Sequence, residues 1–269
     1  MKFAWTAEGI AELRAMKYRT ENRPKMGETD MEQKAPLYRR ILLKLSGEAL
    51  AGEAGRGLDF DVMKDVCRSI KTCVELGVEI GVVTGGGNYW RGVKDGGGKM
   101  ERSRADQMGM LATVMNSLAL AEALEQAGVP VRVQTMIDMP RIAEPYCYGR
   151  AMHHLGKGRV VIFGGGSGNP YFSTDTAAAL KAAEIGADAL LMAKNVDGVY
   201  TADPQLDPGA VRLDELPYDR ILEEHLKVID ASAACLLQDS RIPTVIFALN
   251  PPENIVRAVC GESIGTVVR

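Results

Sequence analysis

Short apolar runs alternate with longer stretches of helical spacing along the chain from residue 37 onward. Uninterrupted runs such as RILLKL and RVVIF predict strands that are buried on both faces. The stretches between them place apolar residues at helical spacing and stop at glycine, which is typical of helices. The predicted strands are residues 40–45, 78–84, 131–135, 159–163, 189–192, 243–248 and 266–268, the last one at a sheet edge. The predicted helices are residues 59–76, 104–127, 174–185 and 229–239.

This order of elements predicts the α/β fold class. Alternating strands and helices favour a mainly parallel central sheet covered by helices on both faces, which is a three-layer αβα sandwich. No internal repeat or flexible linker divides residues 37–269, so we expect a single domain there. Residues 1–36 differ, because they are rich in charge and have no sustained period. We expect them to form a disordered or loosely attached N-terminal extension.

The composition of the 269-residue chain, 46% hydrophobic and 25% charged, is ordinary for a globular protein. A formal net charge of −3 gives no basic field that could hold a nucleic-acid backbone. No apolar run reaches the roughly 18 residues of a membrane span, and the charged N-terminus does not resemble a secretion signal. The five cysteines lack disulfide or metal spacing, so we expect reduced thiols and a cytoplasmic location. His153 and His154 also lack metal-ligand spacing, and we expect both on the surface.

Three loops that contain glycine follow predicted strands. The sequence Lys44-Leu45-Ser46-Gly47 ends the first strand, and triple glycines at 85–87 and 164–166 follow two others. Because the carboxyl ends of parallel strands meet at one edge of a sheet, we expect these loops to lie together. Glycine allows positive φ and close approach of a phosphate, and Lys44 adds a cation. The loops therefore favour a phosphate or nucleotide site over ordinary turns.

Two common nucleotide-binding motifs are missing from the sequence. A Walker A motif requires Gly-Lys followed by Ser or Thr, but Lys99 is followed by Met100. A Rossmann fingerprint requires a third glycine, but Trp90 and Asn169 occupy that position after the two triple-glycine loops. The chain is therefore expected to be neither a P-loop kinase nor a dinucleotide-binding enzyme.

Several polar residues near these loops have both a structural and a functional explanation. Arg91 could hold a phosphate through its forked guanidinium or could be a solvated loop arginine. Asp106 could simply complement the dipole at the start of a helix. The sequence Ser-Thr-Asp at 173–175 could cap a helix or, beside a glycine loop, form an anion site. The stretch 194–203 could be surface turns or could hold a purine and a ribose.

Taken together and in this order, the motifs resemble the bacterial UMP kinases of the amino acid kinase superfamily. The resemblance runs from Tyr38 to Arg269 and is carried by RILLKLSGEAL, GVVTGGGNYWRG, ADQMGMLATVMN, GSGNPYFSTD, VDGVYTADP and LKVIDASA. Other superfamily members share the lysine, the glycine loops and the acid at 175, whereas the Asp106 context and GNPYFSTD select UMP. The resemblance thus implies an amino acid kinase-like fold and transfer of the γ-phosphoryl group from ATP to UMP. The products would be UDP and ADP, in pyrimidine nucleotide biosynthesis.

The resemblance also implies roles for single residues. Lys44, Arg91 and Asp175 would be catalytic, with Asp175 orienting Lys44. The ATP site would comprise Lys44, Leu45, Ser46, Gly47, Gly87, Arg91, Asn195, Tyr200 and Asp203. The UMP site would comprise Gly86, Asp106, Ser167, Gly168, Asn169, Pro170, Tyr171, Phe172, Ser173 and Thr174. The better-known enterobacterial members have threonine and lysine at the positions of Lys194 and Asn195.

Cofactors, effectors and assembly follow from the same resemblance. It implies Mg²⁺ bound with ATP rather than in a dedicated protein site, and an allosteric homohexamer built from dimers. GTP and UTP are the expected effectors. The loop that resembles the region where GTP activates some members is Gly52, Glu53, Ala54, Gly55, Arg56 and Gly57. Neither nucleic acid nor a membrane is an expected partner.

Two other functions remain open from the sequence. A related small-molecule kinase would phosphorylate an amino acid or a carbamate and would show no preference for uracil. A storage protein for oxyanions would keep the fold and bind ATP without turnover, although Lys44, Arg91 and Asp175 together count against this. The lack of a placed histidine base fits a phosphate acceptor, whose second pKa of about 6 leaves it largely ionised at neutral pH.

Overall fold

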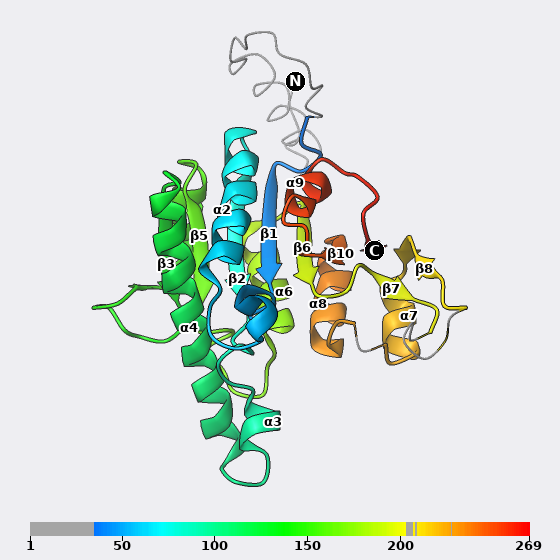
Figure 1. The fold of residues 1–269 in the computed structure, drawn as a ribbon, viewed down its shortest axis with the longest axis horizontal. Helices are drawn as coiled ribbons and strands as arrows, with labels where there is room; N and C mark the ends of the chain where they lie inside the picture. Colours follow the sequence, from blue (N-terminus) through cyan, green and yellow to red (C-terminus); the bar gives the residue numbers. More distant parts are fainter. Residues whose placement is uncertain (1–34, 203–206, 208, 227) are drawn as a thin grey trace, which may run out of the picture. The chain divides into compact units, whose positions relative to one another are not determined.

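The computed structural model describes residues 35–202, 207, 209–226 and 228–269. A nine-stranded, mostly parallel sheet lies at the centre of this part of the chain (Figure 1). Its spatial order is β4-β3-β5-β2-β1-β6-β10-β11-β9, and β7 with β8 forms a separate hairpin. The strands are β1 (Arg40–Leu45), β2 (Glu79–Thr84), β3 (Val131–Thr135), β4 (Glu144–Pro145), β5 (Val160–Gly164), β6 (Ala189–Lys194), β7 (Val199–Tyr200), β8 (Arg212–Leu213), β9 (Glu215–Leu216), β10 (Thr244–Ala248) and β11 (Thr266–Val268).

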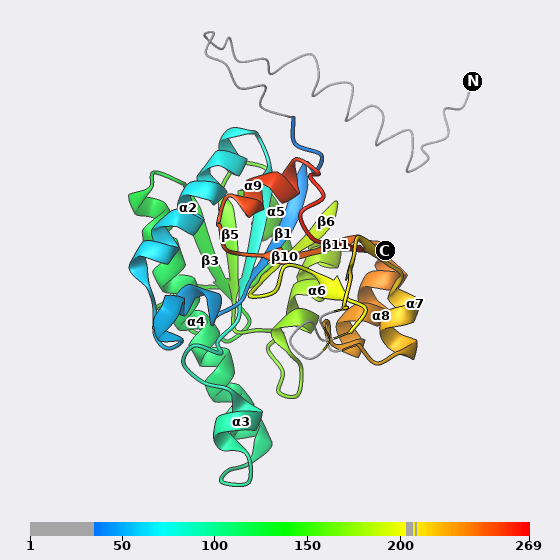
Figure 2. The same ribbon diagram turned by 45° about the vertical axis from the view of Figure 1, so that its right-hand side comes forward.

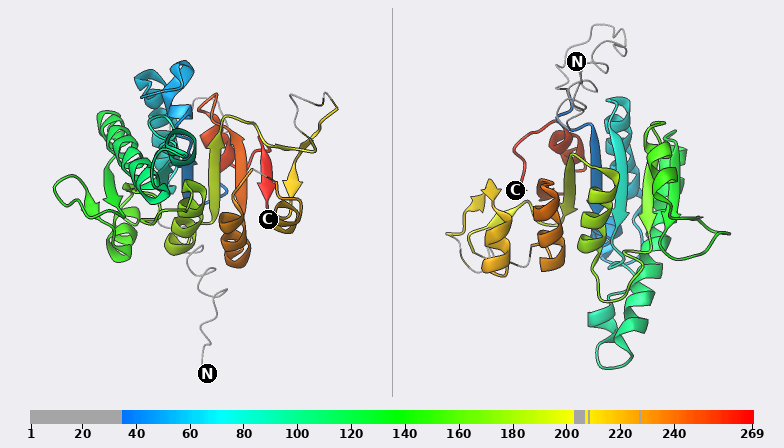
Figure 3. Two further views of the ribbon diagram at one scale, coloured as in Figure 1. Left: turned by 90° about the horizontal axis from the view of Figure 1, so that it is seen from below. Right: turned by 180° about the vertical axis from the view of Figure 1, so that it is seen from behind.

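Helices cover both faces of the sheet, so the predicted three-layer α/β architecture is confirmed (Figure 2 and Figure 3). The first face carries α2 (Phe60–Glu75), α4 (Arg102–Gln126) and α9 (Asn254–Val259). The second face carries α5 (Tyr148–Leu155), α6 (Thr174–Ile185), α7 (Tyr218–Glu223) and α8 (Ala231–Ser240). Two short helices, η1 (Ala49–Ala54) and α3 (Gly92–Gly96), follow β1 and β2.

The central strands β1, β2, β5, β6 and β10 are mostly apolar because both of their faces are buried. Side chains of successive strand residues point to opposite faces of a sheet. In β1, Ile41 and Leu43 pack into the core under α2, whereas Leu42 packs into the core under α6. By the same alternation Lys44 shares the face of Leu42, so its side chain emerges toward α6.

Most predicted elements are confirmed, several with identical bounds. The helix predicted at 59–76 is α2, and the Asp59 side chain caps it by accepting from the backbone N–H groups of Asp61 and Val62. The strand predicted at 266–268 is β11, but its expected place at the sheet edge is wrong. β9 pairs beyond it, and a two-residue strand leaves no periodic signal in the sequence.

The expected surface position of His154 is also wrong, although His153 is exposed. His154 is buried, with Nδ1 3.0 Å from Arg159 Nη1 and Nε2 3.5 Å from Glu144 Oε2. It lies on the inner side of α5, a helix that the sequence analysis did not predict. All five cysteines lie in the described residues and none of them forms a disulfide there, and burial raises the pKa of Cys67 and Cys73 to about 12.

The predicted division of the chain at residue 36 is not tested. Apart from residues 35 and 36, the expected extension lies outside the described residues, and the single domain at 37–269 stays a prediction. Within the described part, none of the helices combines the length and the apolar character that a membrane span requires.

Four neighbouring strands bring the candidate residues to one edge of the sheet. β5, β2, β1 and β6 lie side by side and run parallel, so their carboxyl ends are adjacent. The predicted glycine loops follow β1, β2 and β5. Beyond this edge, α3 and the first turns of α4 project from the sheet (Figure 1 and Figure 2).

Candidate active site

A largely buried carboxylate lies between two lysines at the carboxyl edge of the sheet. Lys44 Nζ, from β1, lies 2.8 Å from Asp175 Oδ1. Lys194 Nζ, from the end of β6, lies 3.2 Å from Asp175 Oδ2 and also donates to the carbonyl oxygen of Val228. Because β1 and β6 are paired in the sheet, the two lysines reach Asp175 from adjacent strands. Each oxygen of Asp175 therefore has its own cationic partner.

Burial and the opposite charge act in opposite directions on the pKa values of Asp175 and Lys194. Burial would raise the pKa of Asp175, but the positive charges of Lys44 and Lys194 outweigh burial and hold that pKa below its usual value. Burial lowers the pKa of Lys194, and the charge of Asp175 opposes that shift. Two ammonium groups around one carboxylate leave a net positive charge, which suits an anionic ligand such as a phosphate.

The start of α6 holds Asp175 in place. Ser173 caps this helix by accepting from the backbone N–H groups of Asp175 and Thr176. The hydroxyl groups of Ser173 and Thr176 both donate to the carboxylate of Asp230. Asp230 in turn caps α8 by accepting from the Ala233 N–H. These hydrogen bonds join the N-termini of α6 and α8 beside the lysines. The structure also confirms that Ser173 caps α6.

Glycine serves two different purposes in the loops. At the first and second loops it allows close approach, since a Cβ on Gly47 would lie only 2.6 Å from the Gly85 carbonyl oxygen. A Cβ on Gly86 would lie 2.7 Å from the Gly109 carbonyl oxygen. In the third loop Gly165 and Gly166 adopt φ values of 84° and 61°, a region that favours glycine. The loops therefore cannot be explained as three equivalent turns.

Asp106 lies against the segment 167–174, as the predicted acceptor site requires. Its Oδ2 accepts from the backbone N–H of Tyr171 at 2.9 Å and from Arg102 Nε at 2.7 Å. The Arg102 guanidinium lies over the Tyr171 ring, with its Cζ 5.3 Å from the ring centroid. Tyr171 and Phe172 themselves are exposed. The structure therefore brings two predicted acceptor elements together, 65 residues apart in the chain.

Arg91 lies beside the second glycine loop but is not free. Its guanidinium forms an ion pair with Glu48, which follows Gly47 directly. Its Nε would lie 3.3 Å from a Cβ built on Gly87. Arg91 could therefore reach a phosphate above Gly87 only by exchanging Glu48 for the new anion.

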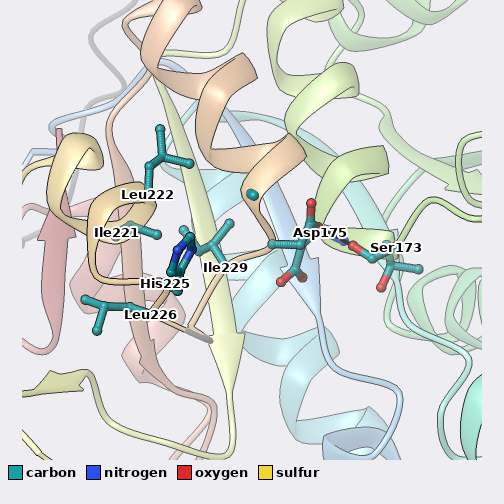
Figure 4. A pocket seen from close by; sticks show the side chains of 10 residues that line it. Ser173, Asp175, Ile221, Leu222, His225, Leu226 and Ile229 are labelled. Carbon is teal, nitrogen blue, oxygen red and sulfur yellow. Dashed lines mark hydrogen bonds between the residues drawn. The ribbon is translucent and has the colours of Figure 1, made fainter.

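A cavity of about 510 Å³ opens next to Asp175 (Figure 4). Ser173 and Asp175 line one side, and α7 with the segment after it lines the other. The lining residues from that second side are mostly apolar: Ile221, Leu222, His225, Leu226 and Ile229. Its size lies within the range of ligand pockets, about 300–1,000 Å³. An aromatic base could be held there with its phosphates near the lysines.

The other predicted site residues lie around this centre. Asn195 lines a second cavity of about 750 Å³, together with Glu48, Gly52 and Glu53. The Tyr200 hydroxyl donates to Asp197 at 3.0 Å. Asp203 lies outside the described residues. The Leu45 side chain belongs to the core, so that only its backbone could contact a ligand.

The loop predicted to bind GTP is hydrogen-bonded to Asn88, which directly follows the second glycine loop. Gly52, Glu53 and Ala54 belong to η1, and residues 53–56 are exposed. The Gly57 carbonyl oxygen accepts from Asn88 Nδ2 at 2.6 Å, and the Gly57 N–H donates to the Asn88 carbonyl at 3.1 Å.

Sequence reasoning missed several functional candidates. The contact of Lys194 with Asp175 was not predicted, because it depends on β6 lying beside β1. The apolar residues of the cavity have the same spacing as an ordinary amphipathic helix, so no sequence pattern distinguishes them from core residues. Asp230 carried a capping signal, an acid directly before a helix, that could have been used.

The residues present do not fit a dedicated metal site. Among residues 35–202, 207, 209–226 and 228–269, no group of three or more His, Cys, Asp and Glu side chains could hold a metal ion. Both oxygens of Asp175 already face ammonium groups, so a cation would have to displace them.

Comparison with known proteins places this chain among kinases. The sequence profile of the amino acid kinase family matches residues 39–248. The structure is similar to the UMP kinase from Bacillus anthracis, with a TM-score of 0.83 and 38% identity over 86% of this chain and 96% of that one. For the UMP kinase from Ureaplasma parvum the TM-score is 0.81, with 35% identity over 86% and 98%. For the uridylate kinase from Archaeoglobus fulgidus it is 0.68, with 30% identity over 85% and 99%.

Replacement of Asp175 by asparagine should destabilise the fold, because two largely buried lysines lose their counter-charge. Breaking a buried ion pair from one side costs about 3 kcal/mol at the lower end of the usual range. The pKa of Asp175 is depressed in the folded state, so its contribution is fully present above its unfolded pKa of about 3.9 and is lost as pH falls through the folded pKa. Urea unfolding of both proteins at pH 7 and at about pH 3 checks this.

We expect the difference in unfolding free energy between wild type and Asp175→Asn to be large at pH 7 and to shrink in acid. A difference that stays the same at both pH values would show that the charge of Asp175 does not contribute to stability.

Proposed function

Because the chain belongs to the amino acid kinase family, we propose that it is a UMP kinase. It transfers the γ-phosphoryl group of ATP to UMP and releases UDP and ADP. The observation that carries the proposal is the Lys44–Asp175–Lys194 cluster beside three glycine loops, in a chain 30–38% identical to UMP and uridylate kinases. Such a cluster provides what two phosphorylated substrates need, which is positive charge at a fixed place.

ATP binds with its phosphates at the two lysines. Lys44 and Lys194 supply the charge, and Gly47 and Gly87 supply backbone N–H groups, because the Ser46 N–H already donates to the Ala193 carbonyl. The adenine base occupies the apolar cavity between Asp175 and α7. Contacts of Tyr200, Asn195 and Asp203 with the adenosine stay predictions from the resemblance, and Asn195 lines the second cavity instead. Arg91 joins the phosphates when it leaves Glu48.

UMP binds on the side of Asp106. Residues 167–174 and Gly86 surround its phosphate, and the Asp106 carboxylate faces the ribose or the base. The hydrogen bond from the Tyr171 N–H to Asp106 supports this arrangement, since it holds both acceptor elements in one place. The exposed rings of Tyr171 and Phe172 provide surfaces against which a pyrimidine could stack.

The reaction needs charge neutralisation more than acid–base help. A phosphate oxygen of UMP forms a bond to the γ-phosphorus of ATP, and the bond from that phosphorus to the β-bridging oxygen breaks. The attacking phosphate is already largely ionised at neutral pH, because its second pKa is about 6. Lys44 and Lys194 lower the repulsion between the two anions, and Asp175 holds both ammonium groups in position.

The ATP phosphates, and not a dedicated protein site, would hold Mg²⁺. Mg²⁺ is usually held by substrate phosphates with one or two carboxylates, and the described residues do not fit a dedicated site. When bound, it would share the phosphate charge with the lysines.

Regulation, location and pathway remain predictions. Activation by GTP at residues 52–57 is supported by the two hydrogen bonds that join Gly57 to Asn88 beside the second glycine loop. Inhibition by UTP, a cytoplasmic location and a place in pyrimidine nucleotide biosynthesis follow from the family resemblance.

An exposed apolar stripe on α4 supports the predicted oligomer. Met108, Leu111, Met115 and Leu118 lie on one face of the helix and are each 38–50% exposed. Four large apolar side chains in one row are more than scattered surface residues, and such patches mark interaction sites.

The charges that flank this stripe favour a second copy of the chain as its partner. Arg104 lies at one end, and Glu122 lies at the other, both exposed. Two copies of α4 can pack antiparallel about a two-fold axis that crosses the helix at the level of residue 113. In that arrangement Arg104 faces Glu122 of the other copy. The same axis pairs Met108 with Leu118 and Leu111 with Met115, so the surface is self-complementary. A dimer formed in this way is a building block for the predicted homohexamer.

One coupled assay of ADP release tests the function. We expect ATP-dependent turnover with UMP, far slower turnover with CMP, and none with amino acids or carbamate. Lys44→Ala should lower kcat at least about a hundredfold, since loss of one charge-stabilising donor typically costs about 2.7–4 kcal/mol of barrier. Turnover of an amino acid or carbamate instead would favour a sibling kinase. Tight ATP binding without any turnover would favour oxyanion storage.

Leu111→Glu should dissociate the α4 pair, because it places charges opposite each other at the centre of an apolar interface. Light scattering coupled to size exclusion should give a mass at least about twofold lower than for wild type. Phe60→Glu is the matched control, since it charges an exposed apolar residue, 71% exposed, on α2. An unchanged mass for Leu111→Glu would contradict the proposed interface.

A further inference from the structure

Helix α4 buries a row of polar side chains where a core-facing helix is normally apolar. Thr113, Asn116 and Ser117 are 3%, 0% and 0% exposed, respectively. One turn further on, Leu120 and Leu124 are fully buried in the usual way. Burying a polar group costs free energy unless a partner satisfies it, so the partners of these side chains indicate what the row does.

Asn116 reaches the second glycine loop. Its Nδ2 donates to the Gly85 carbonyl oxygen at 2.6 Å and to Asn88 Oδ1 at 2.8 Å. Its Oδ1 accepts from Asn88 Nδ2 at 3.0 Å. Gly85 is in turn joined to the first loop, because its N–H donates to the Leu45 carbonyl at 2.9 Å and no Cβ would fit between it and Gly47. Asn116 therefore fixes the point where two loops touch.

Thr113, one turn earlier, reaches the third glycine loop. Its Oγ1 accepts from the Gly165 N–H at 2.9 Å and donates to the Met110 carbonyl at 2.7 Å. Its carbonyl oxygen also accepts from Thr84 Oγ1, at the end of β2, at 3.3 Å. Ser117 differs from both, since its hydroxyl donates only to the Thr113 carbonyl within the same helix.

We infer that Thr113 and Asn116 are positioning residues that set the distance between the donor and acceptor phosphates. Three residues apart on one rigid helix, they hold the third loop and the second loop at a fixed separation. This inference rests on the proposed function, in which the second loop serves ATP and the third serves UMP. A small displacement of either loop would separate the reacting atoms without removing any group that binds a substrate.

Four variants test the inference in steady-state kinetics with ATP and UMP. Thr113→Val keeps the shape but leaves the Gly165 N–H without its acceptor. Asn116→Leu keeps a similar shape but cannot donate to the Gly85 carbonyl. We expect kcat to fall at least about tenfold in both, with each KM within about threefold of wild type. Thr113→Ser, which keeps the hydroxyl, and Ser117→Ala, which removes a buried hydroxyl that donates within α4 and not to a loop, should stay near the wild-type kcat.

Hydrogen–deuterium exchange separates this inference from the proposed function. In Thr113→Val the peptide around Gly165 should exchange faster than in wild type, whereas peptides from the C-terminal half of α4 should not change. That readout needs no turnover, so it applies even if wild type fails to phosphorylate UMP and the proposed function is wrong. Unchanged exchange around Gly165, or a folded Thr113→Val enzyme with wild-type kcat, would overturn the inference. An equal loss of kcat in Ser117→Ala would also overturn it.

Discussion

The carboxylate of Asp175 between two lysines is the interaction on which the candidate site depends. Two ammonium groups from adjacent strands would repel each other at this edge if no anion lay between them. The Asp175 carboxylate offsets this repulsion. Its depressed pKa shows that its attraction to the two lysines outweighs the cost of its burial. The ends of β1, β6 and α6 are consequently held in one place. The remaining positive charge is what a pair of phosphorylated substrates requires.

The sheet supplies the second constraint, which is steric. β5, β2 and β1 are neighbours, so three loops crowd into the space at their carboxyl ends. Gly47 and Gly86 are glycine because a Cβ would collide with backbone atoms, and Gly165 is glycine because its backbone is left-handed. The backbones of the first and second loops therefore lie in direct contact. Polar side chains from the buried face of α4 then keep two of these loops apart by a fixed distance.

Elements with a sustained pattern of apolar residues were predictable from the sequence, whereas contacts between distant segments were not. The strands of the central sheet and α6 follow from their apolar runs and caps, and Lys44 and Asp175 stood out beside glycine loops. The role of Lys194 depends on strand order, which no local pattern encodes. The same holds for the contact of Tyr171 with Asp106, 65 residues away. β4 and β9 have two residues each and leave no period, and buried His154 has no local signal that separates it from exposed His153.

In the proposed mechanism, the rate of phosphoryl transfer depends on lysines that Asp175 holds in place. A single-turnover measurement with saturating ATP and UMP on Asp175→Asn tests this most directly, under conditions in which circular dichroism shows the variant to be folded. The transfer rate should fall at least about tenfold while the affinity for ATP changes little, because the charges remain and only their placement is lost. A folded variant that transfers the phosphoryl group at the wild-type rate would contradict the account.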